Sequence, residues 1–169
     1  MLPVVGKKPV KLVLKGGIKA IRAAKFARKW LFSKKFRKYW KKVNKYAKSG
    51  NKGFEFEAEV AKRYKDRLER FSEDIYYDAG GRITDVDVEL DDVIIECTIS
   101  EKGGKKWRKM TKGLPHIKVN PSGKKLILFA PELLRLNKKP GLVKRLRDAG
   151  VAVIGTYEDL DKLLGETCR

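Results

Sequence analysis

The apolar residues in the first third of the chain recur every three or four positions, the spacing typical of amphipathic helices. They are Ile18, Ile21, Ala24, Phe32, Phe36, Trp40, Val43 and Ala47. We expect these helices to pack on a neighbouring surface; stacking on bases and insertion at a bilayer interface are the alternatives. The polar stretch Ser49 to Gly53 breaks the pattern. It predicts a boundary between a helical extension (residues 1–52) and a domain (residues 53–169).

A second apolar stripe predicts a helix over residues 54–72. Its members are Phe56, Val60, Ala61, Tyr64, Leu68 and Phe71. Glu57 falls near the centre of this stripe, whereas Glu55 and Glu59 point away from it. Because a buried carboxylate needs a cation or hydrogen bonds, Glu57 is a candidate for a metal site or an ion pair. The alternative is a half-exposed acid at a helix N-terminus, where the helix dipole favours negative charge.

Two strands follow the helix and a possible short strand at 75–77. Residues 82–90 alternate strictly, which places Val86, Val88 and Leu90 on one face and Asp85, Asp87 and Glu89 on the other. Residues 93–99 form an apolar strand except for Glu96 and Thr98, which share a side. A solvated face would account for Asp85 and Glu89, but it would not account for Glu96 in so apolar a strand.

The remaining pattern predicts further alternation of helices and strands. We expect a helix near 104–113, a strand at 125–129, a helix at 141–149, a strand at 151–154 and a helix at 158–164. The order is αβββαβ with an αβα tail. It predicts an α/β fold with a mixed central sheet that is covered by helices.

Charge separates the two parts of the chain. The formal net charge is +20, and residues 1–54 contain 18 lysines and arginines and no acid. Such a segment either binds phosphate backbones or acidic lipid, or forms a solvated tail. The sequence contains no run of 18 apolar residues, so no transmembrane segment is predicted. It also contains no continuous apolar region with a cleavage site, so no signal peptide is predicted. Cys97 and Cys168 are interpreted as free thiols and His116 as an isolated surface histidine.

Three acids from one helix and two adjoining strands form a candidate hard-oxygen metal site. Glu57, Asp87 and Glu96 would suit Mg²⁺ or Mn²⁺, with Zn²⁺ as an alternative. Such an ion would polarise a phosphodiester and activate water, and a nearby lysine would stabilise the developing negative charge. The segment from Glu101 to Lys109 supplies several lysines. These lysines are also compatible with the ordinary solvated start of a helix.

These residues resemble the PD-(D/E)XK nuclease superfamily. Gly53, Phe56, Glu57, Val60 and Ala61 are similar to its first-helix motif, Gly-x-x-Phe-Glu-x-x-Val-Ala. Asp87 and Glu96 match the acids of its second and third strands. The resemblance covers about residues 53–130, and it implies a restriction-endonuclease-like αβββαβ core.

Within that superfamily, residues 81–98 are most similar to the C-terminal nuclease domains of bacterial polymorphic and contact-dependent growth-inhibition toxins. Residues 2–6 resemble the linkers that precede such domains. The resemblance implies an endonuclease toxin of interbacterial competition that cuts RNA, with tRNA ahead of DNA. It also implies a cognate immunity protein, which is expected to be acidic, and delivery as a secreted effector into the target-cell cytoplasm. Residues 1–52 would serve delivery, act as a linker or bind nucleic acid.

One position departs from the superfamily pattern. The lysine expected two residues after the third-strand acid is replaced by Thr98. The toxin resemblance allows a later lysine to stand in, and we favour Lys106 over Lys105 and Lys109. Asp85 and Thr98 are expected to support the site. The residues expected to bind nucleic acid are Lys102, Lys105, Arg108, Lys109 and Lys112.

Two other functions remain open from the sequence. A DNA endonuclease, either a toxin or an enzyme of the Holliday-junction-resolvase type, would share the fold and the motif. A non-catalytic, basic nucleic-acid-binding protein would use the same acids only to satisfy its structure.

Overall fold

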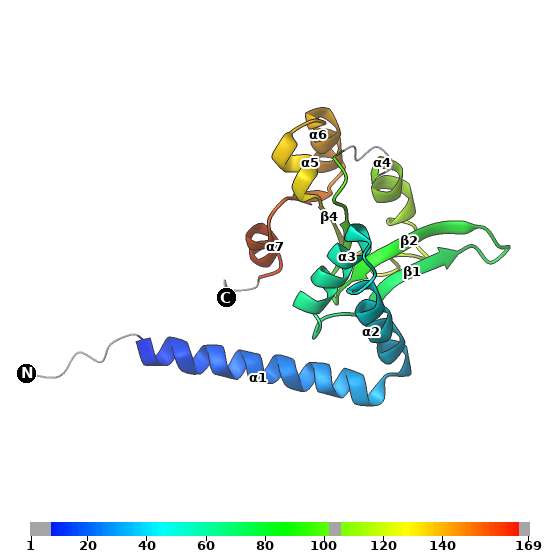
Figure 1. Cartoon of the computed structure of the whole chain (residues 1–169). Coiled ribbons are helices and arrows are strands. Elements are labelled where there is room, and N and C mark those ends of the chain that lie inside the picture. Colours follow the sequence, from blue (N-terminus) through cyan, green and yellow to red (C-terminus); the bar gives the residue numbers. More distant parts are fainter. Residues whose placement is uncertain (1–7, 102–105, 166–169) are drawn as a thin grey trace, which may run out of the picture.

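The structure is a computed structural model that describes residues 8–101 and 106–165, with side chains described from residue 17 onward. The helices are α1 (Lys8–Phe32), α2 (Lys34–Tyr46), α3 (Lys52–Arg63), α4 (Lys106–Arg108), the π-helix η1 (Lys109–Gly113), α5 (Pro131–Leu136), α6 (Pro140–Asp148) and α7 (Tyr157–Leu163). The strands are β1 (Arg70–Tyr76), β2 (Arg82–Glu89), β3 (Val93–Cys97), β4 (Lys125–Phe129) and β5 (Ala152–Ile154). Figure 1 shows their arrangement.

The five strands form one mixed sheet in the order β1-β2-β3-β4-β5. The pairs β1–β2 and β2–β3 are antiparallel, whereas β3–β4 and β4–β5 are parallel. The predicted α/β class and mixed sheet are therefore confirmed. In the element order, α3 is followed by β1, β2 and β3, then by α4 and η1, and then by β4.

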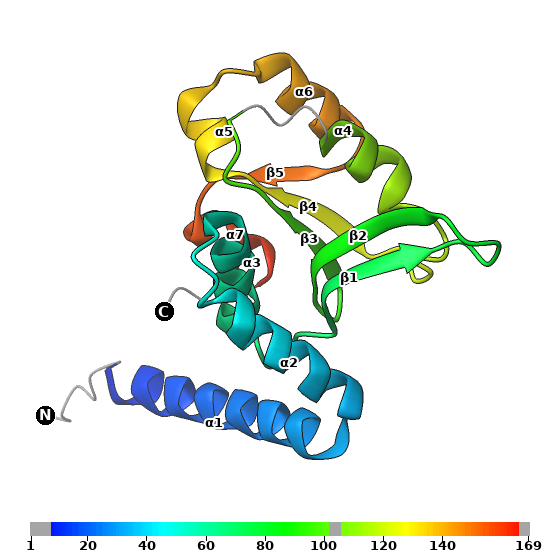
Figure 2. The same cartoon turned by 45° about the vertical axis from the view of Figure 1, so that its right-hand side comes forward.

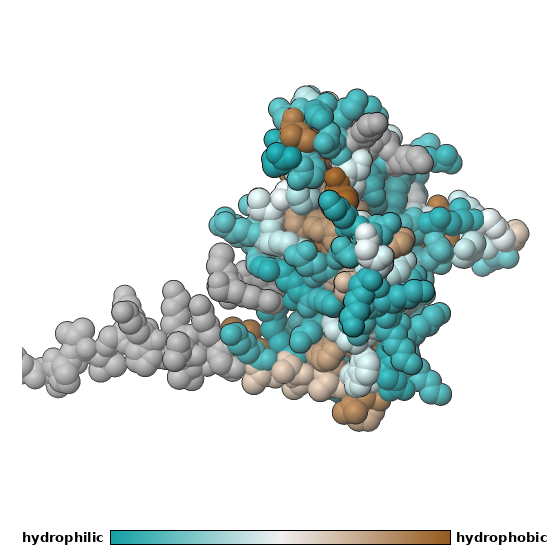
Figure 3. All heavy atoms as spheres, in the orientation of Figure 1, coloured by the Kyte–Doolittle hydropathy of each residue, from teal (hydrophilic) through white to brown (hydrophobic). Residues whose placement is uncertain are grey.

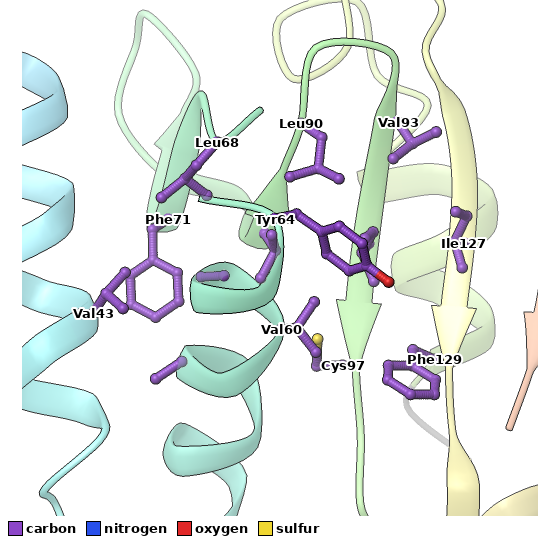
Figure 4. Close-up of a cluster of buried hydrophobic side chains, with 14 of the residues drawn as sticks. Val43, Val60, Tyr64, Leu68, Phe71, Leu90, Val93, Cys97, Ile127 and Phe129 are labelled. Atoms are coloured by element: carbon purple, nitrogen blue, oxygen red, sulfur yellow. The ribbon is translucent and has the colours of Figure 1, made fainter. Parts of the chain in front are cut away.

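Helices cover both faces of the sheet (Figures 1 and 2). One hydrophobic cluster joins the sheet to α2, α3 and α7, and a second cluster joins it to η1, α5 and α6. Figure 4 shows part of the first cluster, in which Val60 of α3 and Tyr64, directly after this helix, face Ile127 and Phe129 of β4. Because β3 lies in the middle of the sheet, all five of its residues are buried. Its one acid therefore lies deep inside the molecule.

The predicted helix at 54–72 is wrong in its second half. α3 ends at Arg63, and β1 already begins at Arg70. Leu68 and Phe71 continue the helical spacing, but both are buried from non-helical backbone and pack in the first cluster. The N–H of Glu69 donates to the carbonyl of Glu89 at 2.8 Å. Strand pairing with β2 thus decides the backbone here, because tertiary context overrides a local pattern.

Two other details differ from the sequence expectation. Val86 packs in the second cluster while Val88 and Leu90 pack in the first, so the predicted alternation of β2 breaks near Asp87. Glu89 is not on a solvated face: its side chain is 7% exposed and forms ion pairs with Arg70 and Lys124. The guanidinium and ammonium groups explain how this carboxylate tolerates burial.

The basic extension is helical, as predicted, and α2 belongs to the first cluster. Ser33 caps α2 by accepting a hydrogen bond from the N–H of Phe36 at 3.0 Å. Phe36, Tyr39 and Val43 are buried against the rest of the fold. The break between α2 and α3 lies where the sequence places the domain boundary, and Asn51 caps α3 there. That boundary stays a prediction, for which α2 offers a direct test.

The pair Phe36 and Phe32 tests whether α2 unfolds together with the domain. Phe36→Ala is expected to lower the free energy of unfolding by about 3 to 5 kcal/mol, because a large buried side chain is lost. Phe32 is 82% exposed, against 4% for Phe36. Phe32→Ala should therefore change that free energy by no more than about 0.5 kcal/mol. Urea unfolding measures both; equal effects would contradict a shared core.

Candidate active site

Glu96 is the innermost member of the site. Its side chain is 0% exposed on the central strand β3. One carboxylate oxygen, Oε1, accepts a hydrogen bond from Lys106 Nζ. The other, Oε2, forms an ion pair with Lys109 Nζ without the geometry of a hydrogen bond. Burial, and then the negative charge of Asp87, raise the pKa of Glu96 to about 8 despite both lysines. The protein therefore buries a carboxylate at a position where its negative charge must be stabilised by cations.

Asp87 links β2 to β3 through its side chain. The strands pair at Val88–Ile95 and Glu89–Ile94. Beyond those pairs, Asp87 Oδ2 accepts a hydrogen bond from the backbone N–H of Cys97 at 2.9 Å, and Oδ1 accepts one from Lys109 Nζ at 2.9 Å. One carboxylate oxygen thus bonds to the backbone of β3, as a paired strand would, and the other oxygen bonds to Lys109.

Lys109 lies at the centre of the acids. Its Nζ is 2.8 Å from Asp85 Oδ2 and 2.9 Å from Asp87 Oδ1, and it also contacts Glu96. Burial alone would lower the pKa of Lys109, but the charges of Asp87, Glu96 and Asp85 outweigh that effect and raise it. The ammonium group stays protonated. In turn, Lys109 holds the pKa of Asp85 below its ordinary value against the opposing effect of burial.

Glu57 approaches from the opposite layer, on α3. Asn51 fixes the start of this helix by accepting hydrogen bonds from the N–H groups of Gly53 and Phe54 at 2.9 and 3.2 Å. Burial and the negative charge of Asp87 raise the pKa of Glu57 to about 8, while Lys109 opposes the shift. The Glu57 carboxylate is thus in the electrostatic field of the cluster formed by Asp87 and Lys109.

The structure brings most of the predicted site residues together. Asp85, Asp87, Glu96, Lys106 and Lys109 are joined by ion pairs, and Glu57 lies within reach of their charges; together we call these six residues the acidic cluster. Thr98 is buried at the end of β3, where its hydroxyl accepts a hydrogen bond from the N–H of Ser100 at 3.1 Å. Its N–H donates to the carbonyl of Phe129 at 3.0 Å, so both hydrogen bonds hold the end of the strand. Lys102 and Lys105 lie outside the described residues.

A groove of about 660 Å³ opens beside the acidic cluster. It is lined by Tyr77, Arg82, Ile83, Thr84, Asp85, Arg108, Lys109, Lys112 and Gly113. Arg108 and Lys112 were predicted to bind nucleic acid, and the groove places them next to Asp85 and Lys109. The contributions of Tyr77 and Arg82 were missed, because they depend on how the β1–β2 hairpin lies against η1. Basic side chains and one exposed tyrosine give the groove the chemistry of a nucleotide strand site.

The donor types of the acidic cluster fit a divalent cation. Three carboxylates, those of Asp85, Asp87 and Glu96, pair with two lysine ammonium groups, and Arg82 reaches Asp85 at 2.6 Å. Oxygen donors with excess negative charge are what Mg²⁺ and Mn²⁺ prefer. As the side chains lie, however, no three metal-ligating groups among the described residues are arranged around a common point. Lys109 Nζ lies between Asp85, Asp87 and Glu96, so a metal ion would compete with this ammonium group.

No family model, curated protein or solved structure matches this chain. Its function is therefore to be inferred from the acidic cluster, the groove beside it and the sequence motifs.

Proposed function

We propose that the chain is a metal-dependent endonuclease that hydrolyses phosphodiester bonds. The observation that carries the proposal is the cluster of carboxylates from β2 and β3 around two lysines from α4 and η1, with Glu57 of α3 within reach of their charges. A fully buried acid at the centre of a sheet is costly, and functional sites are where such perturbed groups gather. The basic groove next to the cluster gives a phosphodiester strand a place to lie.

Asp87 and Glu96 would hold the metal ion, and Glu57 would bind it or orient a water molecule beside it. The ion, when bound, polarises the phosphate and lowers the pKa of water. Arg108 and Lys112 bind backbone phosphates from the wall of the groove. The half-buried position of Glu57 suits contact with both the cluster and solvent.

Lys109 suits the role of the catalytic lysine better than Lys106, which the sequence favoured. Lys109 contacts three acids, and it also lines the groove. Lys106 contacts Glu96 and lies 3.4 Å from the carbonyl of Cys97. We assign the stabilisation of transition-state charge to Lys109, and the positioning of Glu96 to Lys106.

The substrate class rests on the sequence resemblance. By that resemblance the enzyme is a delivered toxin that cuts RNA, tRNA ahead of DNA, in the cytoplasm of a target cell. A cognate immunity protein, expected to be acidic, would then bind close to the groove, where Arg82, Arg108 and Lys112 gather. DNA remains the alternative substrate, because the groove residues recognise phosphate and an exposed base in either polymer.

A non-catalytic role is the competing function, because ion pairs with Lys106 and Lys109 already neutralise part of the cluster. A direct assay distinguishes the three functions. The purified chain is incubated with total tRNA or with supercoiled plasmid, in the presence of Mg²⁺, Mn²⁺ or EDTA. We expect cleavage of tRNA that needs metal. Plasmid cleavage alone would indicate a DNA endonuclease, and intact substrates under every condition would overturn the nuclease proposal.

A further inference from the structure

The long helix α1 is oriented in an unusual way. A surface helix normally turns its apolar side to the core and its charged side to water. In α1, the side that faces the domain carries Arg22, Phe26 and Lys29. Arg22 pairs with Asp66 at 3.1 Å, and Lys29 Nζ donates to the carbonyl of Leu68 at 3.0 Å. Helix α1 is therefore attached to the domain largely by polar contacts.

The side of α1 that points away from the domain carries exposed apolar side chains. Leu31 is 64% exposed, and Ala24 is exposed as well. At 100 degrees per residue these two side chains lie opposite Arg22 and Lys29. Ile21, which is 63% exposed, lies at the edge of that side, where it also lines a hollow together with Arg22 and Asp66. Phe32 follows at the corner between α1 and α2. Figure 3 shows the apolar strip as pale brown and brown spheres along the lower edge of α1 up to that corner.

The corner is held in a defined shape. Phe26 packs against the rings of Phe36 and Trp40, with centroid distances of 5.6 and 5.0 Å. Arg37 donates hydrogen bonds to the carbonyls of Trp30 and Leu31 at 2.9 and 2.8 Å. These bonds satisfy the last carbonyl groups of α1, which would otherwise lack partners. Leu31 and Phe32 therefore project from a fixed corner.

Cations lie within this face and around it. Arg28 lies between Ala24 and Leu31, Lys25 lies at the edge of the face, and Lys34, Lys35 and Lys38 are exposed on the first turns of α2. The first acid in the chain is Glu55. Exposed apolar side chains on a helix rich in lysine and arginine are typical of a helix that lies in the interface of a membrane. None of the described helices is long and apolar enough to cross a bilayer.

We propose that the outer face of α1, formed by Ala24, Leu31 and Phe32 with Ile21 at its edge, binds the surface of an anionic lipid bilayer. Acyl chains and headgroups can cover the apolar side chains, while anionic headgroups pair with Arg28 and the neighbouring lysines. A nucleic acid offers phosphates but no apolar surface for Leu31 and Phe32. A second copy of the chain would bring the same positive charge to the contact and be repelled.

Flotation with vesicles tests the proposal. The chain is mixed with vesicles of phosphatidylcholine alone, or of phosphatidylcholine with phosphatidylglycerol. We expect binding to the anionic vesicles only. The double variant Leu31→Ser with Phe32→Ser should reduce the partition coefficient about tenfold or more, because two large apolar side chains are no longer buried. The matched control is Ile117→Ser, since Ile117 is 68% exposed and far from α1 in sequence. It should bind like the parent chain.

Two further measurements make the result decisive. Circular dichroism should show unchanged helix content in the double variant, and tRNA cleavage should stay at the parent level, so that this proposal and the nuclease proposal fail separately. Brominated lipid should quench the emission of a tryptophan placed in the face by Phe32→Trp, in a background in which Trp30, Trp40 and Trp107 are each replaced by phenylalanine. Failure of the parent chain to float with anionic vesicles would overturn the proposal. So would undiminished flotation of the double variant, or a double variant that loses tRNA binding and keeps vesicle binding.

Discussion

Glu96→Gln is expected to lower the cleavage rate by about 10³-fold or more, because it removes a charged ligand from the site where charge must be stabilised. Gln keeps the shape of the side chain and leaves β3 unchanged. The measurement is a single-turnover rate on tRNA at saturating Mn²⁺. Glu158→Gln on α7, which replaces an exposed acid, is the control and should cleave like the parent chain. Cleavage by Glu96→Gln at the parent rate would disprove this site assignment.

The same variant should fold nearly as well as the parent at neutral pH. Since the pKa of Glu96 is raised to about 8, the carboxyl group is largely protonated at pH 7 in the absence of metal, and Gln resembles that neutral form. Lys106, 22% exposed, can turn toward solvent where the new amide faces it. A loss of activity with retained stability would therefore separate catalysis from folding.

The pH dependence of stability follows from the direction of the same shift. Between the unfolded carboxyl pKa of about 4.3 and the folded value of about 8, the folded chain binds more protons than the unfolded chain. The free energy of unfolding in EDTA should therefore fall as pH rises through this window. Glu57 contributes in the same direction, with its pKa also raised to about 8. Glu96→Gln should flatten the profile, as measured by urea unfolding from pH 5 to pH 8.5.

Lys109→Met should be more damaging than Lys106→Met. The Lys109 variant leaves Asp85, Asp87 and Glu96 without their shared cation, so we expect about 100-fold or more loss of cleavage and about 3 kcal/mol loss of stability in EDTA. Lys106→Met removes one contact to Glu96. Its cleavage should fall by about tenfold or less.

Metal ions distinguish a catalytic lysine from one that merely satisfies the acids. Because Lys109 Nζ lies among the proposed ligands, Mn²⁺ should restore much of the stability that Lys109→Met loses, while cleavage stays low. Thermal unfolding with and without Mn²⁺ measures the first effect. If Lys106→Met proved the more severe change for cleavage, the roles assigned to the two lysines would be reversed.

The sequence predicted two acids of the cluster, Glu96 and Glu57, because each violates a local rule, whereas Asp87 was predicted from the motif. Glu96 interrupts an otherwise apolar strand, and Glu57 lies in the apolar stripe of a helix; the structure buries the first and half-buries the second. The choice of lysine could not be made in the same way. Lys106 and Lys109 are three residues apart and share a helix face, and the π-helical turn that begins at Lys109 shifts the later side chains out of the ordinary helical phase.

The errors arose where tertiary pairing overrides local spacing. Leu68 and Phe71 fit a helical stripe, yet pairing with β2 turns the chain into β1 at Arg70. Glu89 fits a solvated face, but Arg70 and Lys124 enclose it from segments far along the chain. The groove likewise combines residues 77–85 with residues 108–113. A pattern read along the chain contains no information on such long-range pairings until the register of the strands is known.

The two hydrogen bonds of Asp87 limit which substitutions this position can tolerate during evolution. One oxygen accepts from a fixed backbone N–H of Cys97 and the other from the ammonium group of Lys109. Asparagine, one base change away in the genetic code, has a single acceptor oxygen, so its amide group would turn a donor toward one of these two donors. Asparagine is therefore unfavourable whichever way its amide group is turned. In a homologue that has lost catalytic activity, we expect substitutions at Glu57 or Lys106 before any substitution at Asp87.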